Sequence, residues 1–130
     1  MKKLRPALAM LAVLFAVSAC SKVAAAPAAV TAPGKGPIVT FIELGSVNCV
    51  PCKAMHPVME EVRQKYGSQV SVLFYDVWTK AGEPYGRSYG IRVIPTQVFL
   101  DKDGKEYFRH EGFFAAEELY KVLEKGGVKL

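Results

Sequence analysis

Residues 38–52 read IVTFIELGSVNCVPC, an apolar and β-branched run that leads through a short loop to two cysteines three positions apart. The run 38–44 predicts a β-strand covered on both faces, because such strands are almost continuously apolar. Glu43 is its one charged residue. The segment after the loop predicts a helix that ends at Gly67 and buries one apolar stripe. That stripe is expected to contain Val50, Ala54, Val58, Val62 and Tyr66, with Met55 and Met59 beside them.

The rest of the chain predicts three further strands and a final helix. Gly82, Pro84 and Gly86 interrupt residues 79–89, which therefore predict a loop with at most a turn or two of helix. The remaining expected elements are strands at 70–77, 96–100 and 105–109, a hairpin turn at 101–104 and a helix at 115–125. This order predicts an α/β fold with one parallel crossover and an antiparallel edge.

The pair Cys49 and Cys52 carries the chemistry. Cys49 is expected at the amino terminus of the helix, where free backbone N–H groups and the helix dipole stabilise a thiolate, so it is the predicted nucleophile. Cys52 lies one turn further on, close enough to attack a mixed disulfide formed at Cys49 and release the product. Pro51 fits the first helical turn, which needs no backbone donor there.

Other uses of these cysteines remain open at this point. A purely structural disulfide would make the domain a binding module, although so short a loop stabilises little. Zinc would need a second Cys or His pair, and none is evident, so no metal site is assigned. His56, four residues after Cys52, shares its helix face, so a soft-metal carrier binding copper or zinc through Cys49, Cys52 and His56 is the rival function.

Three separated motifs resemble the thioredoxin-like family. The segment 49–53, CVPCK, is similar to the family's active-site motif, Pro57 matches its helix-kinking proline, and residues 89–96, YGIRVIPT, resemble the segment before its cis-proline strand. The likeness extends over nearly all of residues 38–130. It implies a compact thioredoxin-like fold, in which a mixed sheet of about four strands is flanked by helices, and a redox-active Cys49–Cys52 disulfide acting on protein disulfides.

The resemblance also assigns roles to individual residues. It implies a cis peptide at Ile94–Pro95 facing the disulfide, and a buried acid, Glu43, beneath Cys52 with a raised pKa and a role in proton transfer. Solvent exposure of Glu43 is the alternative. Gly112 resembles the glycine at the rim of the docking surface, or is a plain turn glycine. The residues expected to bind substrate are Ile94, Pro95, Asn48, Val50, Pro51 and Gly112.

The chain departs from the family pattern at two positions. Asn48 replaces the aromatic residue that commonly precedes the first cysteine, and Phe74 stands where thioredoxin itself carries a lysine near the buried acid. Proton transfer is therefore expected to depend on Glu43 alone. Trp78 is interpreted as a packing residue of the core or surface rather than as a cover for the active site.

The amino terminus predicts export. A cationic stretch at 1–5, an apolar run at 7–17 and the small residues Ser18 and Ala19 are the three zones of a signal peptide, assigned to 1–19. The residues Val17-Ser18-Ala19-Cys20 resemble the bacterial lipobox, which predicts cleavage before Cys20 and acylation of its thiol. Cleavage after Ala26 is the alternative and would discard Cys20.

Acylation of Cys20 would also account for the third cysteine, which is left over when Cys49 and Cys52 pair. Residues 20–36 are mostly Ala, Pro, Val, Thr and Gly, and predict a flexible tether ahead of a domain at 37–130. The expected location is therefore lipid-anchored to a membrane and facing the periplasm or extracytoplasmic space.

Composition and charge exclude several classes. The 51% hydrophobic content of the 130 residues excludes a disordered chain, and no apolar run is long enough for a multi-pass membrane protein. Removal of Lys2, Lys3 and Arg5 would lower the formal charge from +5 to +2, which favours no nucleic-acid partner. A monomer is expected.

The residues between the cysteines bear on the direction of the reaction. Val50-Pro51 looks like the dipeptides of reducing family members, whereas strong oxidants carry a His there that stabilises the reduced thiolate. The chain is expected to reduce protein disulfides. A membrane thiol electron donor would then reduce its Cys49–Cys52 disulfide again. An oxidase or isomerase is the alternative.

Overall fold

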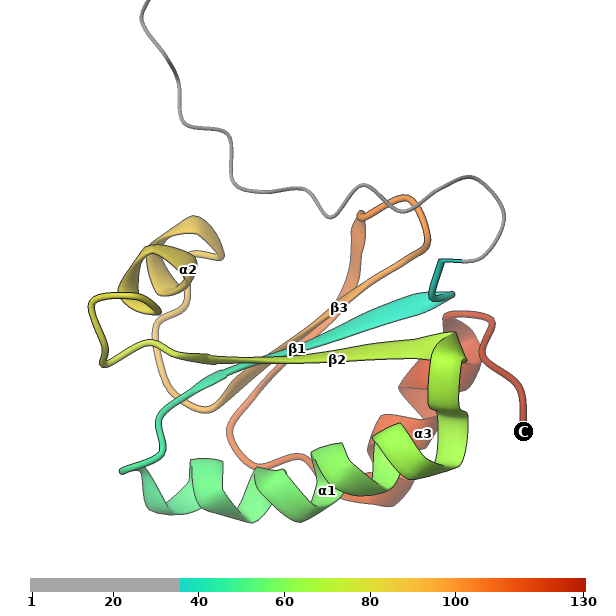
Figure 1. The fold of residues 1–130 in the computed structure, drawn as a ribbon, viewed down its shortest axis with the longest axis horizontal. Helices are drawn as coiled ribbons and strands as arrows, with labels where there is room; N and C mark the ends of the chain where they lie inside the picture. The colour runs from blue at the N-terminus through green and yellow to red at the C-terminus, as the bar shows by residue number, and fades with distance from the viewer. Residues whose placement is uncertain (1–35) are drawn as a thin grey trace, which may run out of the picture. The chain divides into compact units, whose positions relative to one another are not determined.

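The computed structural model describes residues 36–130, which contain three α-helices and four strands (Figure 1). The signal peptide, Cys20 and all of the tether except Gly36 lie outside the described residues. No helix of the described part is both long and apolar enough to cross a membrane. The elements are β1 (Val39–Gly45), α1 (Val50–Tyr66), a 3-10 turn (Gly67–Gln69), β2 (Val70–Asp76), α2 (Glu83–Ser88), β3 (Thr96–Leu100), β4 (Glu106–Glu111) and α3 (Ala116–Lys125).

The four strands form one mixed sheet in the order β2-β1-β3-β4. β1 pairs parallel with β2 and antiparallel with β3, and β3 pairs antiparallel with β4, so the predicted parallel crossover and antiparallel edge are confirmed. α1 and α3 cover one face of the sheet and α2 lies over the other (Figure 1). β1 therefore has neighbours on all sides, which explains its continuous apolar sequence.

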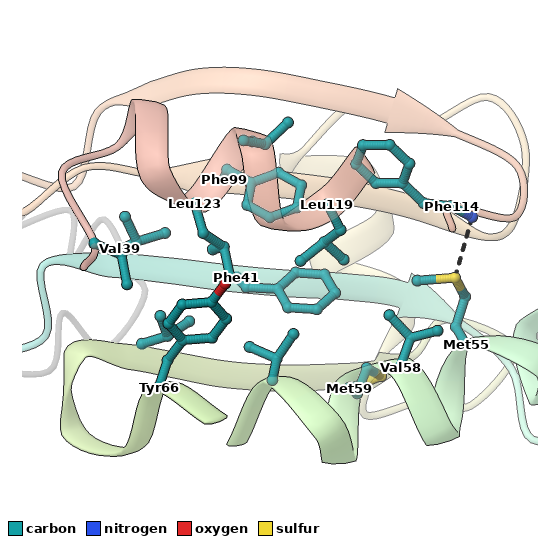
Figure 2. Close-up of a cluster of buried hydrophobic side chains, with 14 residues drawn as sticks. Val39, Phe41, Met55, Val58, Met59, Tyr66, Phe99, Phe114, Leu119 and Leu123 are labelled. Carbon is teal, nitrogen blue, oxygen red and sulfur yellow. Dashed lines mark hydrogen bonds between the residues drawn. The ribbon is translucent and has the colours of Figure 1, made fainter. Parts of the chain in front are cut away.

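The larger core lies between the sheet and the helices α1 and α3 (Figure 2). Phe41 of β1 and Phe99 of β3 stack with ring centroids 4.9 Å apart, and Phe114 meets Phe99 edge-on. The sulfur of Met55 accepts a hydrogen bond from the Phe114 backbone N–H at 3.3 Å. This contact joins the first turns of α1 to the loop before α3, so the cysteine-bearing end of α1 is held by the core.

The predicted stripe of α1 is wrong at its amino-terminal end. Val50 is 78% exposed and Ala54 is also exposed, whereas Cys52 is fully buried. A spacing of four residues advances about 40° around a helix at each step, so a strict four-residue pattern drifts off the buried face. Alternating steps of three and four keep to that face. The fully or largely buried residues that follow this rule are Cys52, Met55, Met59, Val62 and Tyr66, with Val58 beside them.

The other expected elements differ from the structure only at their ends. β4 runs two residues beyond the predicted strand, and β2 ends one residue earlier than predicted. The interrupted segment 79–89 does contain a short helix, α2, of six residues. Gly82 before it packs so closely under the Asp76 carbonyl that a Cβ there would collide with it. That turn directs the chain from β2 to α2 past the active site.

Replacing Phe99 by alanine should lower the free energy of unfolding by about 3–5 kcal/mol, because it empties the space between Phe41 and Phe114. The matched control is Phe113→Ala, since Phe113 is 50% exposed and its loss should cost about 1 kcal/mol or less. Urea unfolding followed by circular dichroism measures both. Equal losses in the two variants would contradict the assignment of Phe99 to the core.

Candidate active site

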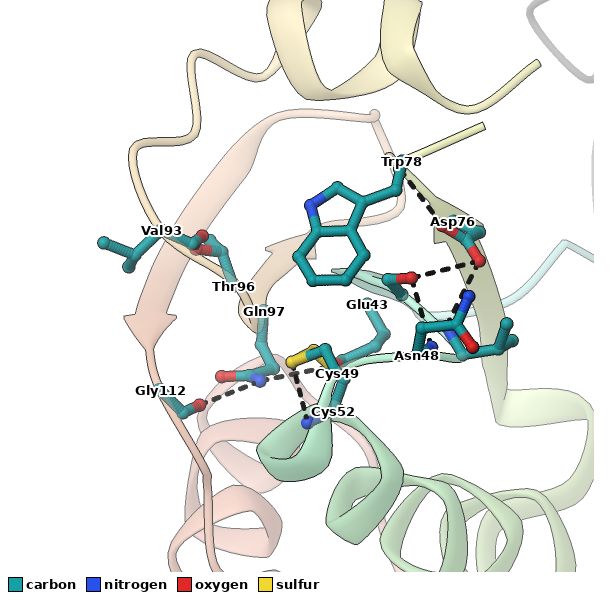
Figure 3. Close-up of a disulfide and its surroundings, with 12 residues drawn as sticks. Glu43, Asn48, Cys49, Cys52, Asp76, Trp78, Val93, Thr96, Gln97 and Gly112 are labelled. Atoms are coloured by element: carbon teal, nitrogen blue, oxygen red, sulfur yellow. Dashed lines mark hydrogen bonds between the residues drawn. A yellow bond between two sulfur atoms is a disulfide. The ribbon is translucent and has the colours of Figure 1, made fainter. Parts of the chain in front are cut away.

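The active-site loop between β1 and α1 is held by a single carboxylate at the end of β2. Asp76 accepts hydrogen bonds from the Ser46 hydroxyl at 3.3 Å, the Val47 N–H at 3.1 Å and the Trp78 N–H at 3.0 Å. Partial desolvation raises the pKa of Asp76, but these hydrogen bonds together bring it below its ordinary value. The charged carboxylate thus ties residues 46–48 to the turn after β2 (Figure 3).

Cys49 and Cys52 form a disulfide at the amino terminus of α1, with their Cα atoms 5.2 Å apart. Cys49 is the N-cap residue, and its sulfur accepts a hydrogen bond from the Cys52 N–H at 3.4 Å. The predicted position of Cys49 at the helix start is therefore confirmed. Cys49 keeps 8% of its surface exposed and Cys52 none, so an incoming substrate can reach only Cys49. This asymmetry fits an attacking Cys49 and a resolving Cys52.

Glu43 is fully buried in the centre of the sheet, beneath the disulfide. Its carboxyl and the Cys52 sulfur both lie beside Gly45: a Cβ on that glycine would lie 3.2 Å from Cys52 Sγ and 3.4 Å from Glu43 Oε1. Burial raises the pKa of Glu43 to about 8, although a hydrogen bond from Gln97 partly opposes the shift. The alternative of a solvent-exposed Glu43 is wrong, because β1 is an inner strand covered on both faces.

Gln97 is a second buried polar residue of the site, and the sequence analysis missed it. It lies opposite Glu43 in the pairing of β1 with β3, and its amide donates to Glu43 Oε2 at 3.0 Å and to the Gly112 carbonyl at 3.1 Å. Glu43 Oε1 has no hydrogen-bond partner within residues 36–130 and lies on the Cys52 side. The available signal was the amide side chain of Gln97, directly before the apolar residues 98–100 of the same strand.

The Ile94–Pro95 peptide bond is cis, as the resemblance predicted. The Pro95 carbonyl accepts a hydrogen bond from the Gly112 N–H at 2.8 Å, so the segments before β3 and after β4 run side by side. Gly112 has φ +93°, a conformation that favours glycine and that a turn alone would explain. Its carbonyl nevertheless faces Gln97, which links this rim to the acid beneath Cys52 (Figure 3).

The remaining predicted substrate-binding residues flank Cys49 on the surface. Asn48, Val50 and Pro51 are all exposed, and Val50 is the most exposed of them. Their role in substrate binding stays a prediction. Together with Ile94, Pro95 and Gly112 they come from three separate segments that the fold brings to the disulfide end of α1.

The structure gives the proposed metal ligand His56 a different neighbour. Its ring packs edge-on against Phe74 of β2, with centroids 5.5 Å apart. Within residues 36–130 no group of three Cys, His, Asp or Glu side chains is placed to hold a metal ion. Phe74 pairs with Glu43 in the β1–β2 register, at the position where a lysine would accompany the acid in thioredoxin.

Trp78 was expected to pack in the core or against the surface, but its side chain is 63% exposed. Figure 3 shows its indole extending from the turn after β2 toward the disulfide. Trp78 therefore belongs to the surroundings of the active site.

Residues 23–127 match the thioredoxin-like domain family. The chain belongs to the thioredoxin-like family. Among its relatives, thioredoxin of Bacillus subtilis is 36% identical over 77 residues, covering 59% of this chain and 71% of the relative. Thioredoxin Y of rice chloroplasts is 33% identical over 76 residues, covering 58% of this chain but only 44% of the relative.

Solved structures agree on the fold. A mutant thioredoxin from Halobacterium salinarum superposes with a TM-score of 0.62 at 23% identity, covering 72% of this chain and 78% of the other. Chloroplastic thioredoxin z superposes with a TM-score of 0.61, covering 68% and 78%. Family membership and the Cys49–Cys52 pair make this thioredoxin-like protein a thiol-disulfide oxidoreductase, with protein disulfides as its substrates.

Glu43 should make the stability of the oxidised protein depend on pH. The folded state keeps a proton on Glu43 up to pH about 8, whereas the unfolded chain releases it near 4.5. The free energy of unfolding should therefore fall as pH rises through this window, by on the order of 5 kcal/mol, and then level off. In Glu43→Gln this contribution disappears.

The measurement is urea unfolding at a series of pH values, with the wild type and Glu43→Gln compared at each pH so that other titrating groups cancel. Glu60→Gln, which removes an exposed carboxylate of α1, serves as the control and should follow the wild type. A constant difference between wild type and Glu43→Gln from pH 4.5 to 8 would contradict the raised pKa.

Proposed function

We propose that this thioredoxin-like protein is a reductase of protein disulfides that works outside the cytoplasm while anchored to a membrane through an acylated Cys20. The observation that carries the proposal is the placement of a partly accessible Cys49 above a buried Cys52 and an uncharged Glu43. The two cysteines can donate electrons to a client disulfide, and Glu43 can exchange the proton that accompanies this step.

The direction is inferred from the residues between the cysteines. Val50 and Pro51 bring no charge to the Cys49 thiolate, whereas a His at this place would stabilise it and make the disulfide oxidising. Stabilisation of the thiolate is left to the helix start and the Cys52 N–H. A less stabilised reduced form has a lower potential and gives its electrons away more readily.

The reaction begins with the reduced protein. The Cys49 thiolate attacks one sulfur of the client disulfide, forms a mixed disulfide and releases the first client thiolate, which takes a proton from water. Cys52 then loses its proton to Glu43 in its ionised form, which a pKa of about 8 leaves as a minority at neutral pH, and its thiolate attacks the Cys49 sulfur. The second client thiolate leaves and is protonated. Two electrons pass to the client, and the protein ends as the Cys49–Cys52 disulfide.

Glu43 suits this proton transfer in both directions. In the oxidised state a pKa of about 8 keeps the accepted proton on the carboxyl at neutral pH. When the disulfide is reduced again, the same proton can return to Cys52 as its thiolate leaves. The unpartnered Oε1 on the Cys52 side is the atom placed for this exchange. The electrons would come from a membrane thiol donor, because an oxidising compartment supplies none.

Trapping tests the disulfide exchange. In Cys52→Ser the resolving thiol is absent, so mixed disulfides between Cys49 and client proteins should accumulate and appear as reducible bands on a gel from cells. The double variant Cys49→Ser, Cys52→Ser is the control and should show none of these bands. A Cys52→Ser sample indistinguishable from the double variant would overturn the proposed exchange reaction.

The reduction potential tests the direction. It should be measured on the full chain carrying Cys20→Ser, in which Cys49 and Cys52 are the remaining thiols, against a thiol-disulfide buffer series. A value near about −270 mV, that of thioredoxin, supports a reductase. A value between about −120 and −180 mV would make the protein an oxidase or isomerase instead.

The proposed location is supported by the sequence of the amino terminus: a signal-like segment at 1–19 followed by Cys20. Two or three acyl chains would anchor the domain stably, which one chain does not achieve.

Bacterial cells grown with labelled palmitate should incorporate the label into the wild type and lose it in Cys20→Ser, with the variant released from the membrane fraction. Cys49→Ser is the matched control, because it also removes one thiol but leaves the lipobox intact. Label retained in Cys20→Ser, or absent from the wild type, would overturn acylation at this cysteine.

A further inference from the structure

Gln97 is a buried polar residue that the exchange reaction described above does not use. It is fully buried on β3, where it lies between Glu43 of β1 and His110 of β4 in the strand register. Burial of an amide costs free energy unless its polar atoms are hydrogen-bonded, and an apolar side chain would fill this place in the sheet without that cost. An amide at this place therefore points to a use for its hydrogen bonds.

The two partners of the amide fix its orientation. Gln97 Nε2 donates to Glu43 Oε2 at 3.0 Å and to the Gly112 carbonyl at 3.1 Å, so both of its hydrogens are used (Figure 3). The Gly112 carbonyl can only accept, so the amide nitrogen has to lie on this side. Gln97 Oε1 is left without a hydrogen-bond partner within residues 36–130. The N–H side of the amide is thus held against the carboxyl of Glu43.

This orientation distinguishes the two oxygens of the Glu43 carboxyl. Oε2 accepts the amide N–H, whereas Oε1 has no partner in the part of the chain that the structure describes. Oε1 is also the oxygen beside Gly45, as is the Cys52 sulfur. A carbonyl-type oxygen accepts a hydrogen bond better than a hydroxyl oxygen does, so the bond to Oε2 favours a proton on Oε1.

We propose that Gln97 is a positioning residue of the disulfide exchange, whose amide holds the Glu43 carboxyl so that Oε1 is the oxygen that takes the proton from Cys52. This inference rests on the proposed function, in which Glu43 is the base for Cys52. In that step the Cys52 thiol gives its proton to Oε1, and the thiolate forms a bond to the Cys49 sulfur. The bond between Cys49 and the client sulfur breaks, and the client thiolate leaves with its electron pair.

Among residues 36–130, no charged side chain shifts the pKa of Glu43: burial raises it and the hydrogen bond from Gln97 lowers it. The neighbouring elements present Phe74 from β2 and the Cys52 sulfur from α1. His110 of β4 lies one strand further away, beyond β3. Loss of the amide should therefore raise the pKa of Glu43 further and leave less of the ionised base at a given pH.

The test separates the attack of Cys49 from the attack of Cys52. The reduced full chain carrying Cys20→Ser is mixed with dithiobis(nitrobenzoate), an aromatic disulfide whose coloured thiolate leaves without being protonated. One thiolate is released when Cys49 attacks, and a second when Cys52 resolves the mixed disulfide. Both rates are measured by stopped-flow absorbance from about pH 6 to pH 9, a range that brackets the pKa of about 8 for Glu43.

In Gln97→Leu we expect resolution by Cys52 to slow by about tenfold at neutral pH, and its rise with pH to move up by about one pH unit, because a hydrogen bond to a carboxylate is lost. Attack by Cys49, in which Glu43 takes no part, should stay within about twofold of the wild-type rate. Gln97→Met, with an unbranched side chain of similar length, should repeat this result.

The matched control is Gln64→Leu. Gln64 donates to Glu60 at 3.1 Å on the exposed face of α1, so this variant removes the same kind of hydrogen bond away from the site. Both of its rates should equal those of the wild type.

Glu43→Gln shows whether Gln97 acts through Glu43. In this background Gln97→Leu should slow resolution by less than about twofold, since the base is already absent. Equal slowing of attack and resolution in both Gln97 variants, or a resolution rate that neither variant changes, would overturn the inference and leave the proposed function standing. A Glu43→Gln protein that resolves at the wild-type rate would instead overturn the proposed role of Glu43, and the inference with it.

Discussion

An uncharged carboxyl group in the middle of the sheet is the constraint on which the active site depends. Glu43 lies on the central strand β1, where the charged form is strongly disfavoured and the protonated form is kept up to pH about 8. Gly45 has no side chain, which leaves the space between the carboxyl and the Cys52 sulfur open. In the proposed mechanism, disulfide exchange is thereby coupled to one proton held in the protein interior.

The surrounding structure holds this arrangement from three sides. The core contact between Met55 and Phe114 holds the first turns of α1, Asp76 holds the loop before it, and Gln97 connects Glu43 to the Gly112 rim. Each connection joins segments far apart in the sequence. The disulfide therefore sits on rigid supports, while the exposed residues around Cys49 and at Trp78 remain available to a client polypeptide.

Local patterns explain how much of the fold could be predicted. The apolar run of β1, the turn residues around α2 and the alternation of the hairpin are properties of neighbouring residues, and the predicted elements match the structure to within a few residues. The α1 stripe was misplaced because a fixed spacing of four ignores the helical period. Cys49 was placed correctly at the start of α1. The signals for a helix start are local, because the loop, the proline and the apolar pattern follow one another in the chain.

The sequence by itself therefore determined the order of the elements, the two-cysteine motif at a helix start and, through family resemblance, the cis bond before Pro95. The tertiary structure confirmed the burial of Glu43 that the resemblance predicted, and it alone decided that Gln97 bonds to Glu43, that Asp76 holds the active-site loop and that Trp78 is exposed rather than part of the core. The physical reason is that burial and hydrogen bonding depend on which strands pair and in which register. Residues 54 positions apart, such as Glu43 and Gln97, meet only when the sheet is complete.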